Sequence, residues 1–370
     1  GTHMGQTTHG GAKMTTVVTD LISRARSGDG DAFQQMIEPH VRELRVHCYR
    51  MLGSLHDAED ALQDTLLAAW QGIDAFQGRA SLRTWLYRIA TNRCLNVRRS
   101  TSRRAAREWN IPGVVPPEPT RLGEVVWLEP FPDALLDNDA HGQLGPEARY
   151  EQTESISIAF ITALQLLPPR QLAVLILRDV LGFHASEVAD ILDSTVESVT
   201  SALKRARTSL QRLPATGDRQ PPAPGSAVEV ALVAKFVSAY ESGDLDALVS
   251  LLTNDVFMSM PPMPLEYEGR QPVADFCSLL FASGRSYRLV PTRANGQPAF
   301  ALYVRAADDV SRGTGLIALT LAGGQIRAMI RFEENVLPLF GLPDSLPNAR
   351  AATTVTTITQ ASGPSVPRAS

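Results

Sequence analysis

The chain has 370 residues, of which 44% are hydrophobic and 20% are charged, and its formal net charge is −4. This length suits two or three domains, and the apolar fraction is sufficient for folded cores, which excludes a wholly disordered chain. Charged residues interrupt the apolar runs before they reach 18 residues, which excludes an ordinary membrane-spanning helix, and we expect no membrane partner.

The three cysteines, Cys48, Cys94 and Cys277, are widely separated and form no CxxC pair. This spacing argues against a disulfide framework and a structural zinc site, so we expect no metal and no other cofactor. Unpaired thiols are typical of a reducing compartment and no signal peptide is evident, so we expect a cytoplasmic location.

The composition along the chain predicts three domains between two tails. Gly1-Thr2-His3-Met4 resembles a tag remnant, and the last stretch is rich in Ala, Thr, Ser and Pro, which is typical of disorder. The predicted order is a tail at 1–27, a helical block at 28–107, a linker at 108–149, a second helical block at 150–214, a short linker at 215–226, a third domain at 227–342 and a disordered tail at 343–370.

The first helical block contains an amphipathic helix at Asp57–Trp70. Leu62 and Leu66 belong to its apolar stripe, and a second stripe at helical spacing is acidic. Such a stripe is either a solvated face or a surface that docks on a basic partner helix. The residues of this acidic face are Asp57, Asp60, Asp64 and Gln71.

An arginine-rich segment follows, because residues 79–107 contain nine arginines and no acid, whereas residues 108–149 contain eight acids and two arginines. Ser81 is placed to cap a helix whose polar side carries arginine and asparagine. Arginine supplies phosphate contacts and asparagine can bond base edges, so we expect a DNA contact rather than a pattern kept for solubility. The candidate DNA-binding residues are Arg79, Ser81, Arg83, Arg88, Asn92, Asn96, Arg98 and Arg99.

The second helical block has the pattern of a helix-turn-helix. A helix at Pro168–Gly182 is followed by a short helix at Glu187–Leu192, and Thr195 can cap a third helix after the turn Asp193-Ser194. The last helix of such a motif enters the major groove of DNA. Its candidate DNA-binding residues are Thr195, Glu197, Ser198, Thr200, Ser201, Lys204, Arg205 and Arg207.

In the third domain, helices are predicted first and strands after them, which indicates an α+β domain. The hairpin turns are placed at Asn295-Gly296 and Gly323-Gly324. The predicted elements are helices at Val228–Tyr240, Leu245–Leu252 and Val273–Phe281, and strands at Tyr287–Pro291, Phe300–Arg305, Gly315–Leu321 and Ile326–Phe332.

No histidine follows His184, so any acid–base chemistry in the third domain would fall to its carboxylates and a tyrosine. The candidates for that role are Asp255, Tyr267, Asp275 and Glu333. A further apolar set forms either the lining of a pocket or ordinary core, namely Phe257, Met258, Met260, Met263, Phe276 and Phe281.

These motifs resemble a known family. DAEDALQDTLLAAW and FQGRASLRTWLYRIATNRCLNVRR look like the second conserved domain of extracytoplasmic-function sigma factors, and the helix-turn-helix block looks like their fourth. FVSAYESGDLDALVSLLTNDVFMSMPP with YEGRQPVADF resembles the SnoaL-like form of the NTF2-like cone fold. Trp127–Asp133 and Asn295–Ala299 are similar to motifs of sigma factors that carry such a fused domain.

The resemblance implies a multidomain protein: two all-α domains, the second a helix-turn-helix, and then an α+β cone. It implies binding of core RNA polymerase through its largest and second-largest subunits. The acidic face would grip the clamp helices of the largest subunit, the arginine-rich helix would hold the −10 element as single strand, and the helix-turn-helix would bind the −35 element. The acidic linker would thread toward the active cleft, or it is a plain flexible tether.

Three functions are compatible with the sequence. The first is a sigma factor without enzymatic activity, modulated in cis by its fused domain. The second is a conventional helix-turn-helix regulator, and the third is a SnoaL-like enzyme on a DNA-binding module. A conventional regulator has no use for the acidic face, which favours the first. The partner of the fused domain would be a small molecule or another part of the chain, and both inhibition and activation fit.

Overall fold

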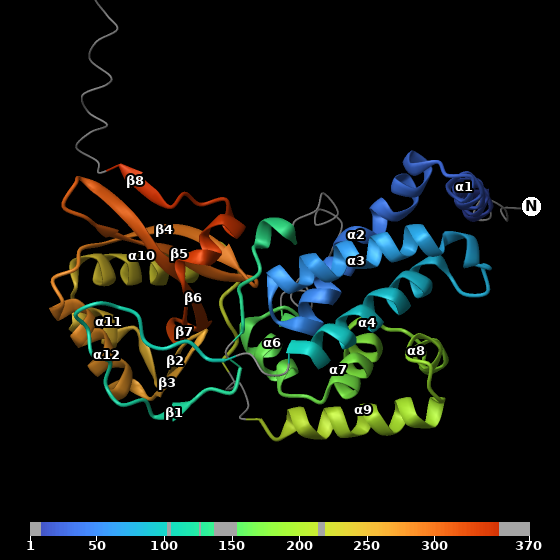
Figure 1. Cartoon of the computed structure of the whole chain (residues 1–370). Coiled ribbons are helices and arrows are strands. Elements are labelled where there is room, and N and C mark those ends of the chain that lie inside the picture. Colours follow the sequence, from blue (N-terminus) through green and yellow to red (C-terminus); the bar gives the residue numbers. More distant parts are fainter. Residues whose placement is uncertain (1–8, 102–104, 126, 137–153, 214–218, 348–370) are drawn as a thin grey trace, which may run out of the picture. The chain divides into compact units, whose positions relative to one another are not determined.

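The computed structural model describes residues 9–101, 105–125, 127–136, 154–213 and 219–347 (Figure 1). They divide into two compact units. Unit 1 contains Gly1–Ala106 and Glu124–Gly217, and unit 2 contains Arg107–Gly123 and Asp218–Ser370. The division corrects the expected linker at 108–149, because its first part belongs to the same unit as the C-terminal domain and its next part to the helical unit.

The first helical block of unit 1 is built from α1 (His9–Arg26), α2 (Gly30–Leu52), α3 (Leu55–Gly72), a 3-10 turn (Ile73–Ala75) and α4 (Leu82–Thr101). Asp29 caps α2, and Ser54 caps α3 by accepting a hydrogen bond from the Asp57 amide. Gly53 lies between them with φ +70°, a conformation that favours glycine, and lets the chain reverse.

The expected tail at 1–27 is wrong for its described part, because α1 is a packed helix. Ala25 is 2% exposed, and the Arg26 guanidinium donates to the Ile73 and Phe76 carbonyls beyond α3. The sequence of α1 predicts a helix only weakly, because its first turn has no acidic residue and it contains the pairs Gly-Gly, Thr-Thr and Val-Val. Packing on α2 stabilises the helix.

The second helical block comprises α6 (Ile158–Gln165), α7 (Pro169–Leu175), a π-helical turn (Ile176–Val180), α8 (Ala185–Ile191) and α9 (Val196–Gln211). As predicted, the long helix ends at Gly182 with φ +71°, and Thr195 caps α9 by accepting from the Ser198 amide at 3.2 Å. The pair α8 and α9 forms the helix-turn-helix.

Unit 2 folds as an α+β domain with a mixed sheet. The described strands are β1 (Arg121–Leu122), β2 (Leu252–Met260), β3 (Met263–Glu268), β4 (Tyr287–Ala294), β5 (Gln297–Arg305), β6 (Val310–Ala322), β7 (Gln325–Phe332) and β8 (Ser345–Pro347). They follow the order β1-β3-β2-β7-β6-β5-β4, with β8 on β6. Only β2 and β7 run parallel, since the other pairs are antiparallel.

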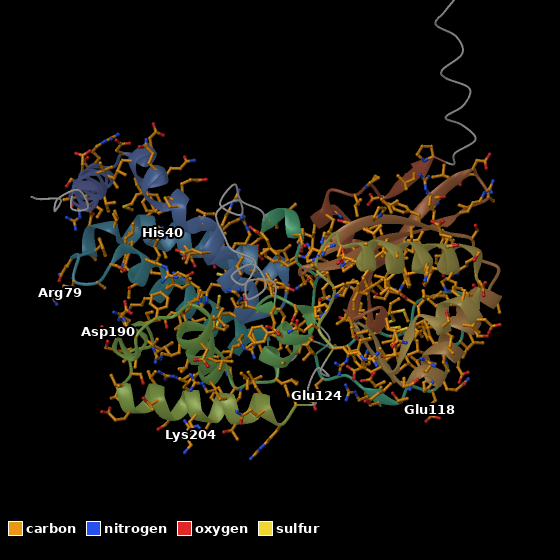
Figure 2. All side chains as sticks on the ribbon, turned by 180° about the vertical axis from the view of Figure 1, so that it is seen from behind. His40, Arg79, Glu118, Glu124, Asp190 and Lys204 are labelled. Atoms are coloured by element: carbon orange, nitrogen blue, oxygen red, sulfur yellow. The ribbon has the colours of Figure 1, made fainter. Side chains whose placement is uncertain are left out.

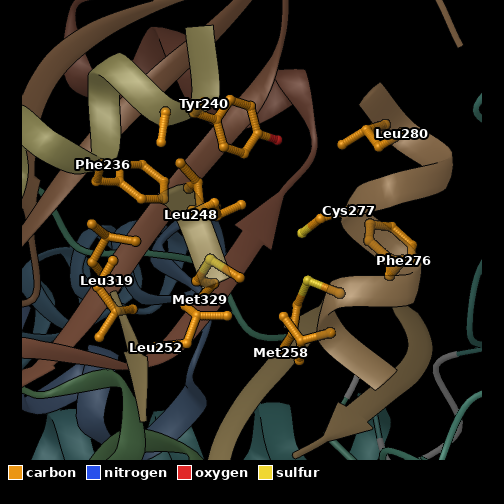
Figure 3. Packing of buried hydrophobic residues seen from close by; sticks show 14 of the residues in the cluster. Phe236, Tyr240, Leu248, Leu252, Met258, Phe276, Cys277, Leu280, Leu319 and Met329 are labelled. Carbon is orange, nitrogen blue, oxygen red and sulfur yellow. The ribbon is translucent and has the colours of Figure 1, made fainter. Parts of the chain in front are cut away.

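Two helices, α10 (Ala227–Ser242) and α12 (Arg270–Ala282), pack on the sheet, and α11 (Leu245–Ser250) packs against both of them. Figure 3 shows side chains from α10, α12 and the strands directed at one another in an apolar interior. Met258, Met260, Met263 and Phe276 belong to this core and Phe281 packs against it, so the core interpretation of these residues is confirmed. Phe257 is half-buried on β2.

The end of unit 2 differs from the expected disordered tail at 343–370. Ser345–Pro347 forms β8 and pairs with Val310–Arg312 of β6. The Gly313 amide also donates to the Asp344 carbonyl at 2.8 Å. Residues 348–370 lie outside the described residues.

Candidate nucleic-acid interface

The acidic face of α3 is positioned by the burial of its opposite side, where Ala58, Leu62 and Ala69 are almost fully covered. Asp60, Asp64 and Gln71 are exposed and Asp57 is half-buried. Leu67, which the sequence analysis missed, lies at the same helical spacing and is 55% exposed. An exposed leucine among carboxylates suits docking on a partner surface that is partly basic and partly apolar. The sequence does contain a sign of this exposed leucine, because Leu67 is an apolar residue on an otherwise polar stripe.

The polar face of α4 carries the predicted arginine and asparagine residues. Ser81 caps this helix as predicted, since its hydroxyl accepts from the Thr84 amide at 3.0 Å. Arg79 lies in the loop before the helix (Figure 2). The exposed set on α4 consists of Arg88, Asn92, Asn96 and Arg99, together with Arg93, which was not among the predicted residues. This face offers cations and amide groups to solvent and to DNA.

Arg83 and Arg98 lie elsewhere, since both are half-buried in protein contacts. Arg83 pairs with Glu43 at 3.0 Å, and its guanidinium carbon lies 4.5 Å from the centre of the Phe183 ring of the second block. Arg98 donates to the Met51 carbonyl at 3.1 Å and to the Gln165 side-chain oxygen at 2.5 Å. Burial lowers the pKa of Arg98. In this structure, these two arginines connect the helical blocks.

The outward side of α9 carries all the residues predicted for it, and each is exposed, namely Thr195, Glu197, Ser198, Thr200, Ser201, Lys204, Arg205 and Arg207. Lys204 projects from the helix in Figure 2. Arg207 is held by a bidentate pair with Asp179, at 2.7 and 2.8 Å. Lys204 and Arg205 are therefore the better placed cations for phosphate contacts.

A shallow groove of about 260 Å³ lies on the second block and was not predicted. Phe160, Leu175, Val180 and Leu210 give it an apolar floor, and the Asp179–Arg207 pair lies at its edge. Because its lining comes from α6, the end of α7, the π-helical turn and α9, no single stretch of sequence indicates it.

The motif at Trp127–Asp133 is docked on the turn between α2 and α3. The Trp127 indole donates to the Leu52 carbonyl at 3.2 Å, and the Phe131 ring lies 4.9 Å from that of Tyr49. The Glu129 carboxylate accepts from the Ser54 hydroxyl at 3.1 Å and the His56 amide at 3.0 Å. A carboxylate is favoured at a helix N-terminus, so Glu129 stabilises the start of α3.

The acid–base candidates of unit 2 are not gathered in one site. Asp255 is exposed and lies 3.6 Å from Arg327, and Asp275 is exposed and accepts from Gln271. Tyr267 and Glu333 are buried, and both bond to the segment Arg107–Gly123.

Two of the described histidines, His47 and His184, lie where helices pack or begin. His47 is buried with its Nε2 at 2.9 Å from the Thr91 hydroxyl, and burial lowers its pKa to about 3. His184 starts α8, and its amide donates to Glu187 at 2.8 Å. Within the described part of the chain, no group of three His, Cys, Asp or Glu side chains could hold a metal, and no helix is long and apolar enough to cross a membrane.

Comparison with known proteins agrees with this geometry. Residues 36–104 match the model of Sigma-70 region 2, residues 157–210 match Sigma-70 region 4, and residues 233–329 match the SnoaL-like domain. The "ECF RNA polymerase sigma factor SigG" of Mycobacterium tuberculosis is 42% identical over 342 residues, which cover 87% of this chain and 86% of that protein.

Two further proteins are similar over other extents. SigW of Bacillus subtilis is 27% identical over 54% of this chain and 97% of its own length. The crystal structure of Mycobacterium tuberculosis SigJ shares the fold with a TM-score of 0.51 at 20% identity, covering 82% of this chain and 96% of that one. On the SigG match above all, the chain belongs to the ECF family of RNA polymerase sigma factors and carries a fused SnoaL-like domain.

Proposed function

We propose that this sigma factor binds core RNA polymerase, directs it to promoters through their −35 and −10 elements, and there initiates transcription. The observation that carries the proposal is one compact unit that presents an acidic face on α3 and an exposed Arg and Asn face on α4. A carboxylate surface suits a basic protein partner, whereas a guanidinium and amide surface suits DNA.

The acidic face is the contact for the largest polymerase subunit. Asp60 and Asp64 supply charge, and the exposed side chain of Leu67 supplies apolar area between Asp64 and Gln71. The groove lined by Phe160, Leu175 and Leu210 is the contact for the second-largest subunit, because its apolar floor accepts an apolar side chain.

The DNA contacts are divided between the two helical blocks. Arg88, Asn92, Asn96 and Arg99 hold the −10 element as an opened strand, with Arg79 reaching it from the loop before α4. Extrusion of a base from the stack costs a few kcal/mol, which contacts to the backbone and the base edges offset. The exposed start of α9 reads the −35 element in the major groove.

The fused domain regulates transcription and does not catalyse a reaction. Its two buried acid–base candidates, Tyr267 and Glu333, are both hydrogen-bonded to residues of the chain itself. We place the protein in the cytoplasm, where polymerase and promoter DNA are found.

Reconstitution tests the proposal. Core RNA polymerase and the full chain should together initiate transcription on genomic promoter fragments of the source organism, whereas the chain alone should not retard the same fragments in a gel. Tight duplex binding by the free chain, without any effect on polymerase, would instead support a conventional helix-turn-helix regulator.

A further inference from the structure

The segment Arg107–Gly123, here called the strap, is separated in sequence from the C-terminal domain by the whole second helical block, yet it folds with that domain. Its backbone follows β3, since the Thr120 amide donates to the Glu266 carbonyl at 3.0 Å and the Gly123 amide to the Pro264 carbonyl at 2.7 Å. Arg121 and Leu122 form β1, opposite Glu266 and Leu265. The strap therefore adds an edge strand to the sheet.

Apolar side chains of the strap enter the core of the domain. Ile111 and Val114 are 8% and 7% exposed and belong to the same cluster as Met258 and Phe276. The Trp109 ring packs edge-on against Phe276 with a centroid distance of 5.7 Å, and its indole N–H donates to the Val114 carbonyl at 2.6 Å. These contacts are those of a ligand seated in an apolar site, made here by the chain itself.

The polar contacts centre on Glu333, whose side chain is 4% exposed. The Arg107 guanidinium donates to it at 2.6 Å and the Asn110 amide at 3.0 Å. Both of these donors come from the strap. Burying a carboxylate without hydrogen-bond donors is strongly unfavourable. Burial of Glu333 in the C-terminal domain therefore depends on the cation and the amide that the strap supplies.

A second buried group of the domain has the same dependence. Tyr267 on β3 is fully buried, and its hydroxyl donates to the Pro117 carbonyl of the strap at 2.7 Å. The strap thus satisfies two polar groups that the domain buries, at two points along its length.

We propose that the C-terminal domain is a binding site for the chain's own linker, with Glu333 as its charged anchor, and that docking of the strap restrains the linker and lowers transcription initiation. The role in transcription rests on the proposed function. The strap connects α4 of the first block to the second block, so residues folded on the C-terminal domain cannot extend through polymerase at the same time.

The first arm of the test releases the strap in the full chain. The variant R107A/N110A removes both donors to Glu333 and leaves the apolar anchors in place. R305A is the matched control, because Arg305 forms an exposed ion pair with Asp309 in the same domain. Deuterium exchange of peptides from the strap should rise about tenfold in R107A/N110A and stay unchanged in R305A. Run-off transcription with core polymerase should rise in the same variant.

The second arm fixes the strap in place. Leu122 and Leu265 lie opposite each other in an antiparallel pair, which is a spacing that a disulfide can bridge, and Leu122 is 65% exposed. The variant L122C/L265C should initiate less transcription when oxidised than wild type does, and dithiothreitol should restore it.

The outcomes test separately whether Glu333 anchors the strap and whether docking of the strap lowers transcription. Unchanged strap exchange in R107A/N110A overturns the anchoring by Glu333. Faster exchange with unchanged transcription, or a cross-linked chain as active as wild type, overturns the regulatory role. Failure of the wild-type chain to initiate transcription overturns the proposed function and the regulatory role with it, while the exchange result still decides whether the strap is anchored.

Discussion

Arg98 provides a test of how the two helical blocks are held together. Its guanidinium donates to the Met51 carbonyl at 3.1 Å and to the Gln165 side chain at 2.5 Å, and two longer contacts reach the Gln165 and Leu167 carbonyls at 3.4 Å. Gln165 is itself only 5% exposed. Replacement by methionine keeps most of the aliphatic volume and leaves these acceptors without their donor.

The magnitude follows from the two short contacts. A hydrogen bond from a charged donor contributes about 1.5–3 kcal/mol, and the cost of burying the guanidinium, seen in its lowered pKa, opposes this. We expect Arg98→Met to lower the free energy of unfolding of unit 1 by about 2–4 kcal/mol, which shifts a urea midpoint by about 1 M.

Tryptophan fluorescence suits the measurement, because three of the four tryptophans, Trp70, Trp85 and Trp127, belong to unit 1. Arg99→Met is the control, since Arg99 is exposed on the same helix and should affect DNA binding while leaving the urea midpoint unchanged. A midpoint for Arg98→Met equal to that of Arg99→Met would refute the reasoning.

Three further predictions concern the same unit. Glu129→Gln should destabilise the docked motif by about 1 kcal/mol, because it weakens the carboxylate contact at the start of α3, and faster deuterium exchange in 127–133 would show it. Arg88→Ala should weaken promoter binding by the holoenzyme and reduce the number of counterions released on binding by about one. That number is obtained from the slope of the logarithm of the binding constant against the logarithm of the salt concentration, and an unchanged slope would contradict a phosphate contact. The buried imidazole of His47 has a pKa of about 3, whereas the unfolded group titrates near 6.5, so acid favours the unfolded state. Wild type should therefore lose about 1.4 kcal/mol per pH unit below 6.5 relative to His47→Gln, and parallel stability profiles of the two proteins would contradict this.

Local signals in the sequence predicted most of the helical unit. Ser81 and Thr195 occupy the cap positions assigned to them, and Gly182 ends its helix, because capping depends on residues within one turn. The Asn295-Gly296 hairpin between β4 and β5 was correct for the same reason, since both residues adopt positive φ.

Elements that depend on distant pairing were missed. β2 pairs in parallel with β7, which lies more than 60 residues later, and its alternation of buried and exposed residues begins only at Val256. β1 is two residues long and exists because β3 is beside it. β1 is too short to show a period, and the residue types of β2 do not alternate as its burial does, because Val256, Phe257 and Met258 are all apolar.

The candidate interface was predicted by residue type more reliably than by orientation. Arginine composition alone does not distinguish Arg99, on the exposed side of α4, from Arg98, which faces the second block. Leu67 was missed because exposed leucine contradicts the usual pattern of burial. Both cases need the packing of neighbouring helices, which a single stretch of sequence does not contain.

The most direct test of the account is the affinity of core RNA polymerase for a chain with Asp60→Asn and Asp64→Asn, compared with wild type and with Glu38→Gln. Glu38 is an exposed acidic residue on the neighbouring helix α2, so its variant tests whether the loss of an acidic charge outside the acidic face also weakens binding. We expect the double variant to bind core polymerase at least about tenfold more weakly, with unchanged stability, and Glu38→Gln to bind as wild type does. Equal affinity of all three chains would contradict the assignment of the acidic face to the polymerase.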